Sequence, residues 1–394
     1  MPTTVTIDDI LRPSVVLGKI SRNRVQYLTC TEELGLTPKY VVNNDEDGTR
    51  DSNLSTPNSV ELPARAGLYD IFDRPQDGVN VVGPGAPAEL VAPQVVGQVA
   101  YRVARFHPAM LFKYDEMNQR RSIGQAANVL DKGGATYVSN QANTLGLRTL
   151  NSLEIMTLGM MRDSLYLEPT GAPDAYKLSF TAGTNPIRIN FQMPAGNKLK
   201  LDMLGSGDIV ATSWDNLAAP ILADLHAISA AFVKLCGRPL RKVMVNSKGW
   251  MNIINNTEVR TAAGTATSPY NSYEVNEEKM ADGIRRATAK ATLKTLPGVE
   301  FIINDEWITV AGTAVQKIPD ANAFFCTDTN DVFKLGYYSE QIAEQPGQPP
   351  MFKDAFSTWW EHKSDPSGVK LYYLMNCIPM NLVPNASAWG TVVY

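Results

Sequence analysis

The stretch that most constrains the fold is residues 61–110, which are rich in Val, Gly and Pro and poor in helix signals. Two strand-like pieces, "GVNVV" and "VVGQVAYRV", flank the turn-forming run at residues 83–87. This pattern predicts a long two-stranded excursion. Because an isolated hairpin is marginal in water, the excursion needs another surface to lie on.

The rest of the chain predicts an α+β protein. The first 60 residues alternate short apolar and polar pieces and are expected to form an extended arm. Strand-like pieces follow from Tyr176 to Met203 and from Val299 to Val383, with a tight turn at residues 365–368. Helices and strands come in mixed order, with no regular βαβ alternation.

Apolar periodicity predicts three helices. The first covers residues 143–166, and Pro169 ends it. The second has Asp215 or Asn216 near its N-cap and Pro220 in its first turn, and it stops at Gly237. The third is expected from about Glu277 to Thr295, ended by Pro297-Gly298.

Composition excludes several classes of protein. The 394 residues are 44% hydrophobic and 19% charged, which is typical of a globular chain long enough for two or three domains. A net charge of −4 argues against tight nucleic-acid binding, although a local patch could still contact DNA weakly. The first residues, "MPTTVTIDDILRPS", do not resemble a secretory signal, and no apolar run reaches the roughly 20 residues that cross a bilayer. We therefore expect a soluble protein without a membrane partner.

The segment "KVMVNSKGWMNIINN", residues 242–256, resembles a phosphate-binding loop because a strand, a polar turn with Lys and Gly, and a helix follow one another. A Walker A motif needs two glycines around four residues, followed by Lys and then Ser or Thr. Here a single Gly follows the Lys, and Ser247 suits a helix N-cap. We predict a structural corner.

Two other motifs are also weak. Residues 83–88, "GPGAPA", formally fit a dinucleotide fingerprint, but Pro93 would cut the required helix short. Residues 43–51 imitate the start of a calcium loop, yet Leu54 stands where the bidentate Glu should be. A loop tip and an exposed acidic turn are the expected structures.

No catalytic, cofactor-binding or metal-binding residue is predicted, and the chain is not expected to be an enzyme. The three histidines are isolated in sequence, and the four cysteines form no CxxC pair and are expected to be buried thiols. These residues are His107, His226, His362, Cys30, Cys236, Cys326 and Cys377.

A resemblance comes from the order of several segments. "DIVATSWDNLAAPILADLHAISAAF" leads into "KVMVNSKGWMNI", then "IPDANAFF", and a final "CIPMNLVPNASAWGTVV". This series resembles the lambda-type major capsid proteins of tailed phages, the E family of the HK97-like capsid fold. Asn246, Lys248, Gly249 and Trp250 match its Asn/Asp-x-Lys-Gly-Trp turn, and residues 318–320 match its "LPD"-like wording. The resemblance covers about residues 60–394.

The resemblance implies a major capsid protein of the virion, assembled in the host cytoplasm into the icosahedral shell that encloses the DNA genome. Its implied partners are copies of itself in pentameric and hexameric capsomers. Scaffold, decoration and portal proteins are further candidate partners, with packaged double-stranded DNA contacted weakly and non-specifically. Two alternatives stay open: an encapsulin-like cellular compartment, and an α+β enzyme with an unrecognised site.

The implied parts follow the chain. They are an N-terminal arm at 1–60, an extended loop at 61–108, a peripheral domain with its spine helix at 109–213, an axial domain at 214–340, and return strands at 341–394. Residues 257–274 are expected to form an exposed loop near the capsomer axis. Residues 75–95 are expected to reach over a neighbouring subunit, and no covalent cross-link is expected.

Overall fold

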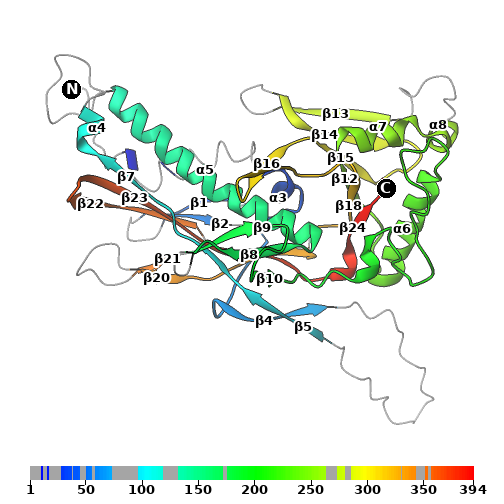
Figure 1. Cartoon of the computed structure of the whole chain (residues 1–394), viewed down its shortest axis with the longest axis horizontal. Helices are drawn as coiled ribbons and strands as arrows, with labels where there is room; N and C mark the ends of the chain where they lie inside the picture. Colours follow the sequence, from blue (N-terminus) through cyan, green and yellow to red (C-terminus); the bar gives the residue numbers. More distant parts are fainter. Residues whose placement is uncertain are drawn as a thin grey trace, which may run out of the picture. The chain divides into compact units, whose positions relative to one another are not determined.

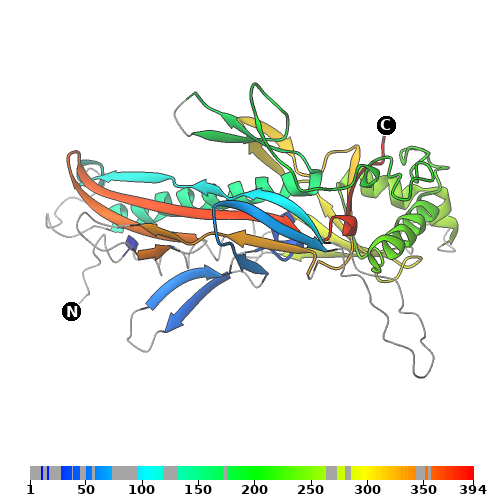
Figure 2. The same cartoon turned by 90° about the horizontal axis from the view of Figure 1, so that it is seen from below.

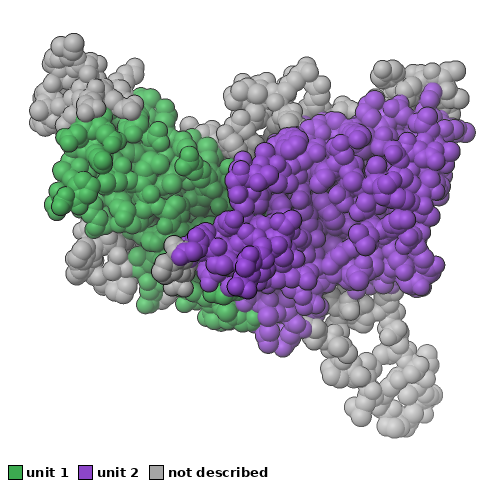
Figure 3. All heavy atoms as spheres, viewed as in Figure 1, with its two compact units in different colours: residues 1–67, 102–157, 334–380 green, residues 68–101, 158–333, 381–394 purple. Residues whose placement is uncertain are grey.

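The computed structural model describes two compact units of the chain, which Figure 3 colours separately. Unit 1 comprises residues 1–67, 102–157 and 334–380, and unit 2 comprises residues 68–101, 158–333 and 381–394. The described residues are 10–11, 16, 28–37, 39–44, 50–55, 58–72, 96–118, 132–171, 175–262, 273–279, 285–329, 331–342, 351–353 and 356–394.

Unit 1 is built around a six-stranded sheet in which β23 is the longest strand (Figure 2). Its main path runs β22-β23-β19-β3, and β6 and β7 also pair with β23. The strands are β22 (Phe356–Ser364), β23 (Ser367–Asn381), β19 (Phe333–Tyr337), β3 (Ser59–Glu61), β6 (Ala104–Phe106) and β7 (Ala109–Lys113). The predicted tight turn at 365–368 is confirmed where β22 pairs back onto β23.

Smaller elements complete unit 1. They are α3 (Thr29–Glu33), α4 (Tyr114–Asn118), the pair β1 (Lys39–Asn44) and β2 (Arg50–Ser55), and the pair β20 (Glu340–Ile342) and β21 (Met351–Lys353). The long helix α5 (Lys132–Arg162) is seen in Figure 1. Most of it also belongs to unit 1, while its residues from Leu158 belong to unit 2.

Helix α5 is longer than predicted. The expected helix at 143–166 exists, but it begins at Lys132 and ends at Arg162, and the strand β8 (Leu165–Pro169) follows. The added N-terminal turns are polar and contain Gly, so their intrinsic helix propensity is low. Tertiary contacts stabilise them, because Val138 is fully buried and the Tyr373 hydroxyl donates to the Ala142 carbonyl at 3.0 Å.

Polar residues fit inside α5 because their hydroxyls bond to the helix itself. The side chains of Thr149 and Thr157 donate to the carbonyls four residues earlier, at 3.0 Å each. Both residues are buried, so these bonds satisfy hydroxyls that would otherwise be costly to desolvate.

The last residues of α5 organise part of unit 2. The Arg162 guanidinium lies 4.5 Å from the Phe180 ring centroid and 5.2 Å from that of Trp389. It also donates to the carbonyls of Gln316 and Lys317, at 2.9 and 2.7 Å. One side chain thus holds three distant segments together by cation–π contacts and charge-assisted hydrogen bonds.

The centre of unit 2 is a seven-stranded mixed sheet in the order β11-β24-β18-β12-β15-β14-β13. Its strands are β11 (Lys198–Leu199), β24 (Ser387–Thr391), β18 (Asn322–Cys326), β12 (Lys242–Val245), β15 (Glu300–Asn304), β14 (Arg285–Leu293) and β13 (Tyr273–Lys279). Successive residues of β12, β15 and β18 are buried, which is the pattern of strands covered on both faces. The Trp250 and Phe301 rings lie 5.4 Å apart, where α7 (Ser247–Asn255) packs on β15.

Two small sheets, a hairpin base and short helices also belong to unit 2. The other elements are β4 (Ala66–Phe72) paired with β5 (Val96–Arg102), β10 (Ile187–Ile189) and β9 (Tyr176–Ser179) on either side of β8, β16 (Trp307–Val310) paired with β17 (Thr313–Gln316), α6 (Ile221–Cys236), α8 (Thr257–Ala262), η2 (Ala195–Asn197) and η4 (Pro384–Ala386). The β4–β5 pair confirms the base of the predicted excursion. Its tip at 83–87 lies outside the described residues.

The predicted bounds of the second helix are partly wrong. Helix α6 ends where expected, because Gly237 is in the left-handed conformation at φ 70° and its N–H donates to the Val233 carbonyl. It begins at Ile221 with Pro220 at the N-cap, and Asp215 and Asn216 lie in turns before it.

The predicted third helix at 277–295 is wrong. Of its described residues, 277–279 lie in β13 and 285–293 lie in β14, while 280–284 lie outside the description. Strand β14 pairs antiparallel with β15, with Ala291 opposite Phe301. Alanine-rich sequence favours a helix locally, but pairing with a buried central strand outweighs that weak preference.

Helix α6 carries a buried carboxyl group, Asp224, whose side chain accepts a hydrogen bond from Trp214 Nε1 at 3.0 Å. Burial raises the pKa of Asp224 from 3.8 to about 6, against the opposing effect of the Trp214 bond, and the Glu258 carboxylate adds to the rise. The folded chain therefore holds this proton more tightly than the unfolded chain does.

The substitution Asp224→Asn should change how stability depends on pH. A raised carboxyl pKa contributes stability that is complete below about pH 4 and is lost as the pH rises through about 6. Asparagine stays neutral and still accepts the indole N–H. We expect the variant to be more stable than the parent by about 1–2 kcal/mol at pH 7.5, after discounting the shift for solvent screening, and equal to it near pH 4.

Urea denaturation of both chains at the two pH values measures this difference. Parallel pH profiles for parent and variant would contradict the assignment of the proton to Asp224.

Candidate functional site

The turn between β12 and α7 is a structural corner, as predicted. The N-cap of α7 is Asn246, whose Oδ1 accepts the Gly249 N–H at 2.8 Å. The expectation that Ser247 is the cap is wrong by one residue, since Ser247 is the first residue of the helix. Both Asn and Ser side chains can cap a helix by accepting an N–H of its first turn. The sequence alone therefore allows either Asn246 or Ser247 as the N-cap.

Acidic side chains already occupy the N-terminus of α7. The Asp305 carboxylate accepts the Ser247 N–H at 2.8 Å and also its hydroxyl. The Asp320 carboxylate accepts from the Asn246 carboxamide and pairs with Lys248 Nζ at 3.2 Å. These carboxylates use the donors that a phosphate would need, and their charge would repel it. The corner is therefore not a nucleotide site.

The other two weak motifs do not converge on a site in the described residues. Residues 83–88 and 45–49 lie outside them. At the calcium-like stretch, Asn43 and Asp51 stand opposite each other in the β1–β2 pair. The structure places these flanking residues on strands.

The three histidines have separate surroundings. The His107 ring lies 5.3 Å from Trp359 and 5.6 Å from Tyr372. Burial lowers the pKa of His107, with help from the Arg105 and Lys370 charges and against the effect of Glu340. His362 Nδ1 lies 3.0 Å from the Tyr114 hydroxyl, and His226 is exposed on α6.

The four cysteines are buried free thiols, as expected, and burial raises the pKa of Cys377 above its usual range. Within the described ranges, no three His, Cys, Asp or Glu side chains gather as a metal site would require. Among the helices that the structure describes, none has the length and apolar character of a membrane span.

The most distinctive surface of unit 2 lies on α6 and α8. The solvent-facing side of α6 carries mostly small apolar residues, and Leu217, just before the helix, is 59% exposed. Val233 is 45% exposed near the other end of α6. We call this the α6–α8 surface, and it consists of Leu217, Ala218, Ala223, His226, Ala227, Ala230, Val233, Lys234, Thr257, Glu258, Thr261 and Ala262. Apolar side chains concentrated on one face are typical of a protein-binding surface.

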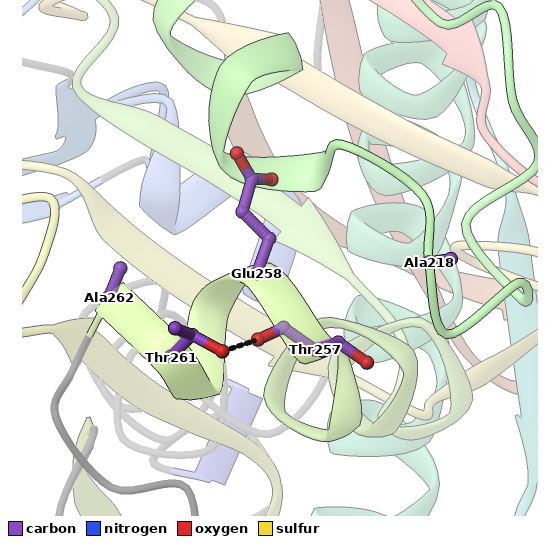
Figure 4. Close-up of a pocket in the computed structure, with 5 residues that line it drawn as sticks. All are labelled: Ala218, Thr257, Glu258, Thr261 and Ala262. Carbon is purple, nitrogen blue, oxygen red and sulfur yellow. Dashed lines mark hydrogen bonds between the residues drawn. The ribbon is translucent and has the colours of Figure 1, made fainter.

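A hollow of about 520 Å³ lies at the end of this surface, lined by Ala218 and four residues of α8 (Figure 4). Glu258 points from α8 to the N-terminus of α6, where its Oε2 accepts the Leu222 N–H at 2.8 Å. Pro220 provides no side-chain cap for α6, so Glu258 fills that role. The hollow is lined mainly by carbon atoms, and its one carboxylate, Glu258, already accepts a hydrogen bond from Leu222. Such a lining suits the binding of an apolar group rather than catalysis.

Helix α8 is held in place by Asn256, whose Oδ1 accepts the Glu258 N–H at 3.0 Å and whose Nδ2 donates to the Ala219 carbonyl at 2.8 Å. The expectation of a loop from residue 257 is wrong for Thr257–Ala262, and residues 263–272 lie outside the description. Sequence reasoning missed the hollow. The alanines of "ADLHAISAAF" were a readable signal for the small apolar face of α6, but not for the hollow.

Comparison with known proteins identifies the family. The model of the family described as phage major capsid protein E matches residues 76–392, which is most of the chain. No curated protein matches.

Several solved structures show a distant likeness. A putative capsid protein of a prophage of Escherichia coli CFT073 is 12% identical, with 75% of this chain and 79% of that one covered and a TM-score of 0.45. A phage-related protein from Bordetella bronchiseptica RB50 is also 12% identical, with coverages of 85% and 88% and a TM-score of 0.45. The mature capsid of bacteriophage PhiM1 is 9% identical, with coverages of 89% and 92% and a TM-score of 0.41. These scores are low, so the assignment rests on the family model.

Membership in this family confirms the predicted resemblance and, with it, the α+β class and the HK97-like capsid fold. The protein has a structural role in the virion, where copies of it assemble into the icosahedral shell of the phage head, and it is not an enzyme. The chain belongs to the phage major capsid protein E family.

Proposed function

We propose that the chain forms pentameric and hexameric capsomers of a tailed-phage head, with neighbouring copies meeting through the α6–α8 surface. The observation that carries this proposal is the exposure of apolar residues on elements that are themselves firmly packed. Leu217 and Val233 are exposed, while Ile221, Leu225 and Ile228 of the same region are buried. A rigid apolar face of this kind is ready to pack against a copy without reorganising.

The domain division predicted from sequence is part of the same proposal. The axial domain at 214–340 would contain the α6–α8 surface, and residues 257–274 would lie near the capsomer axis. The peripheral domain at 109–213 would contain α5 as the spine helix, with the arm at 1–60 and the return strands at 341–394. The extended loop at 61–108 would include the β4–β5 base.

Contact with packaged double-stranded DNA is proposed to be weak and non-specific, because the net charge of −4 offers little general attraction to phosphate. Scaffold, decoration and portal proteins remain candidate partners, and assembly is proposed to take place in the host cytoplasm.

The substitution Ala230→Glu tests the α6–α8 surface. Ala230 is exposed in the middle of α6, so a glutamate there should leave the subunit folded. At an interface between copies, the same carboxylate would be desolvated without a partner. We expect at least a tenfold smaller fraction of subunits in shells, measured by sedimentation, with an unchanged circular dichroism spectrum.

The matched control is Ala230→Ser, which adds a small neutral hydroxyl at the same position and should assemble normally. Normal assembly of the glutamate variant would show that this face of α6 stays open in the shell.

The extended loop provides a second test of assembly. The pair β4–β5 holds its base, where the Gln98 carboxamide donates to Asp70 Oδ1 at 3.2 Å and the Tyr69 and Tyr101 rings lie 6.4 Å apart. Residues 75–95, beyond this base, lie outside the described residues, and from their sequence we propose that they reach over the neighbouring subunit and bury apolar side chains there. Each buried Val or Leu could contribute roughly 1.5–3 kcal/mol, less the entropy of ordering the loop.

Replacing residues 79–91 with a short Gly linker should therefore abolish closed shells while leaving the helical and strand content nearly intact. Circular dichroism and sedimentation measure the two effects. A companion variant, with Val81→Ser and Val82→Ser, keeps the loop length and should weaken assembly in the same direction. Shells of normal size from the deletion variant would refute the bridging role, and global unfolding would place the loop in its own subunit's core.

A further inference from the structure

The N-terminal region contributes a short, fully packed segment to unit 1, residues 28–37, which we call the strap. Its apolar side chains are completely enclosed, because Leu28, Leu34 and Leu36 each have 0% exposure and Cys30 has 1%. The strap contains the single short helix α3. Burial of this extent indicates a docked element of unit 1 rather than a surface coil.

The C-terminal end of α3 is closed by the strap itself. Gly35 has a φ of 72°, and its N–H donates to the Glu32 carbonyl, while the Leu36 N–H donates to the Thr31 carbonyl at 2.9 Å. This is the Schellman arrangement, in which glycine takes the left-handed position. The C-terminal end therefore needs no outside partner.

The N-terminal end of α3 is closed from outside. Its N-cap residue is Leu28, which has no side-chain acceptor for the first N–H groups. The missing acceptor comes from Glu154, which lies on α5 about 124 residues away and is fully buried. Glu154 Oε1 accepts the Cys30 N–H at 2.9 Å, and Oε2 accepts the Thr31 N–H at 3.0 Å.

Two hydroxyl groups complete this contact. Thr31 Oγ1 donates to Glu154 Oε2 at 2.6 Å, and Thr29 Oγ1 donates to Oε1 at 3.4 Å. Each carboxylate oxygen thus receives one backbone and one side-chain donor from the strap. Because the carboxylate is buried, these four donors stabilise its charge, and opening the strap would lose all four bonds.

We propose that Glu154 is a positioning residue that latches the strap to α5, so that residues 28–37 dock or release as one unit. The four donors disappear together when the strap leaves, and this makes the transition all-or-none. The latch fixes where residues 28–37 lie on α5. This inference is independent of the α6–α8 surface and can be tested on unassembled subunits.

The test is hydrogen exchange of the full-length subunit, read by mass spectrometry, in the parent and in Glu154→Gln. Glutamine keeps the size of the side chain but replaces one acceptor oxygen with an NH₂ group, which then faces donors of the strap. We expect the strap amides to exchange at least ten times faster, because charge-assisted hydrogen bonds are lost. Amides of the β22–β23 pair should keep their parental rates.

Two further variants complete the design. Thr31→Val removes one hydroxyl donor and leaves the carboxylate in place, so the strap should exchange about threefold faster. The matched control is Thr149→Val on the same helix, since the buried Thr149 hydroxyl bonds to the Leu145 carbonyl. The control should leave strap exchange unchanged.

The latch is refuted if the strap of Glu154→Gln exchanges at the parental rate. It is also refuted if the strap and the β22–β23 pair accelerate by the same factor, since Glu154 would then support the whole unit rather than the strap. Should the glutamine variant not accumulate as folded protein, Thr31→Val decides, and an unchanged strap in that variant overturns the proposal.

Discussion

Unit 2 depends on the two residues at the C-terminal end of α5. The Arg162 guanidinium packs on the rings of Phe180 and Trp389. It also donates to the carbonyls of Gln316, the last residue of β17, and of Lys317, which follows it. Asp163, 4% exposed and at φ 48°, accepts the Phe191 N–H at 3.0 Å and pairs with Lys198 Nζ at 2.5 Å. The small β10-β8-β9 sheet, the β16–β17 hairpin and the strands β11 and β24 are therefore tied to one helix end. Removing either charge would break several of these contacts at once.

Several features could be predicted from the sequence because local chemistry decides them. Gly237 ends α6, the run at 299–304 is a strand, and the residues at 365–368 turn because short-range geometry requires particular residue types. The expected family also rested on the order of such local segments. The predicted secondary structure was wrong where contacts between residues far apart in sequence determine it. Residues 285–293 form a strand because β15 is available for pairing, and Lys132–Ala142 are helical because β23 packs on them.

The candidate surface was harder to predict than the fold. The hollow beside α8 exists because Asn256 and Glu258 bond to backbone groups near residues 217–222. Helix α6 begins some 35 residues before Asn256, and no local sequence pattern links the two. Hydrophobic periodicity could therefore not predict that α8 packs beside the start of α6. The corner at α7 shows the opposite case. Its sequence imitates a phosphate loop, and the carboxylates of Asp305 and Asp320, far along the chain, show why no phosphate fits.

The central proposal is that copies of this chain build shells through apolar faces on a rigid subunit. Negative-stain electron microscopy of the expressed full-length chain tests that claim most directly. The account predicts closed shells of uniform size, or rings of five and six subunits. A chain that stays a compact monomer at concentrations where capsid subunits assemble would contradict it.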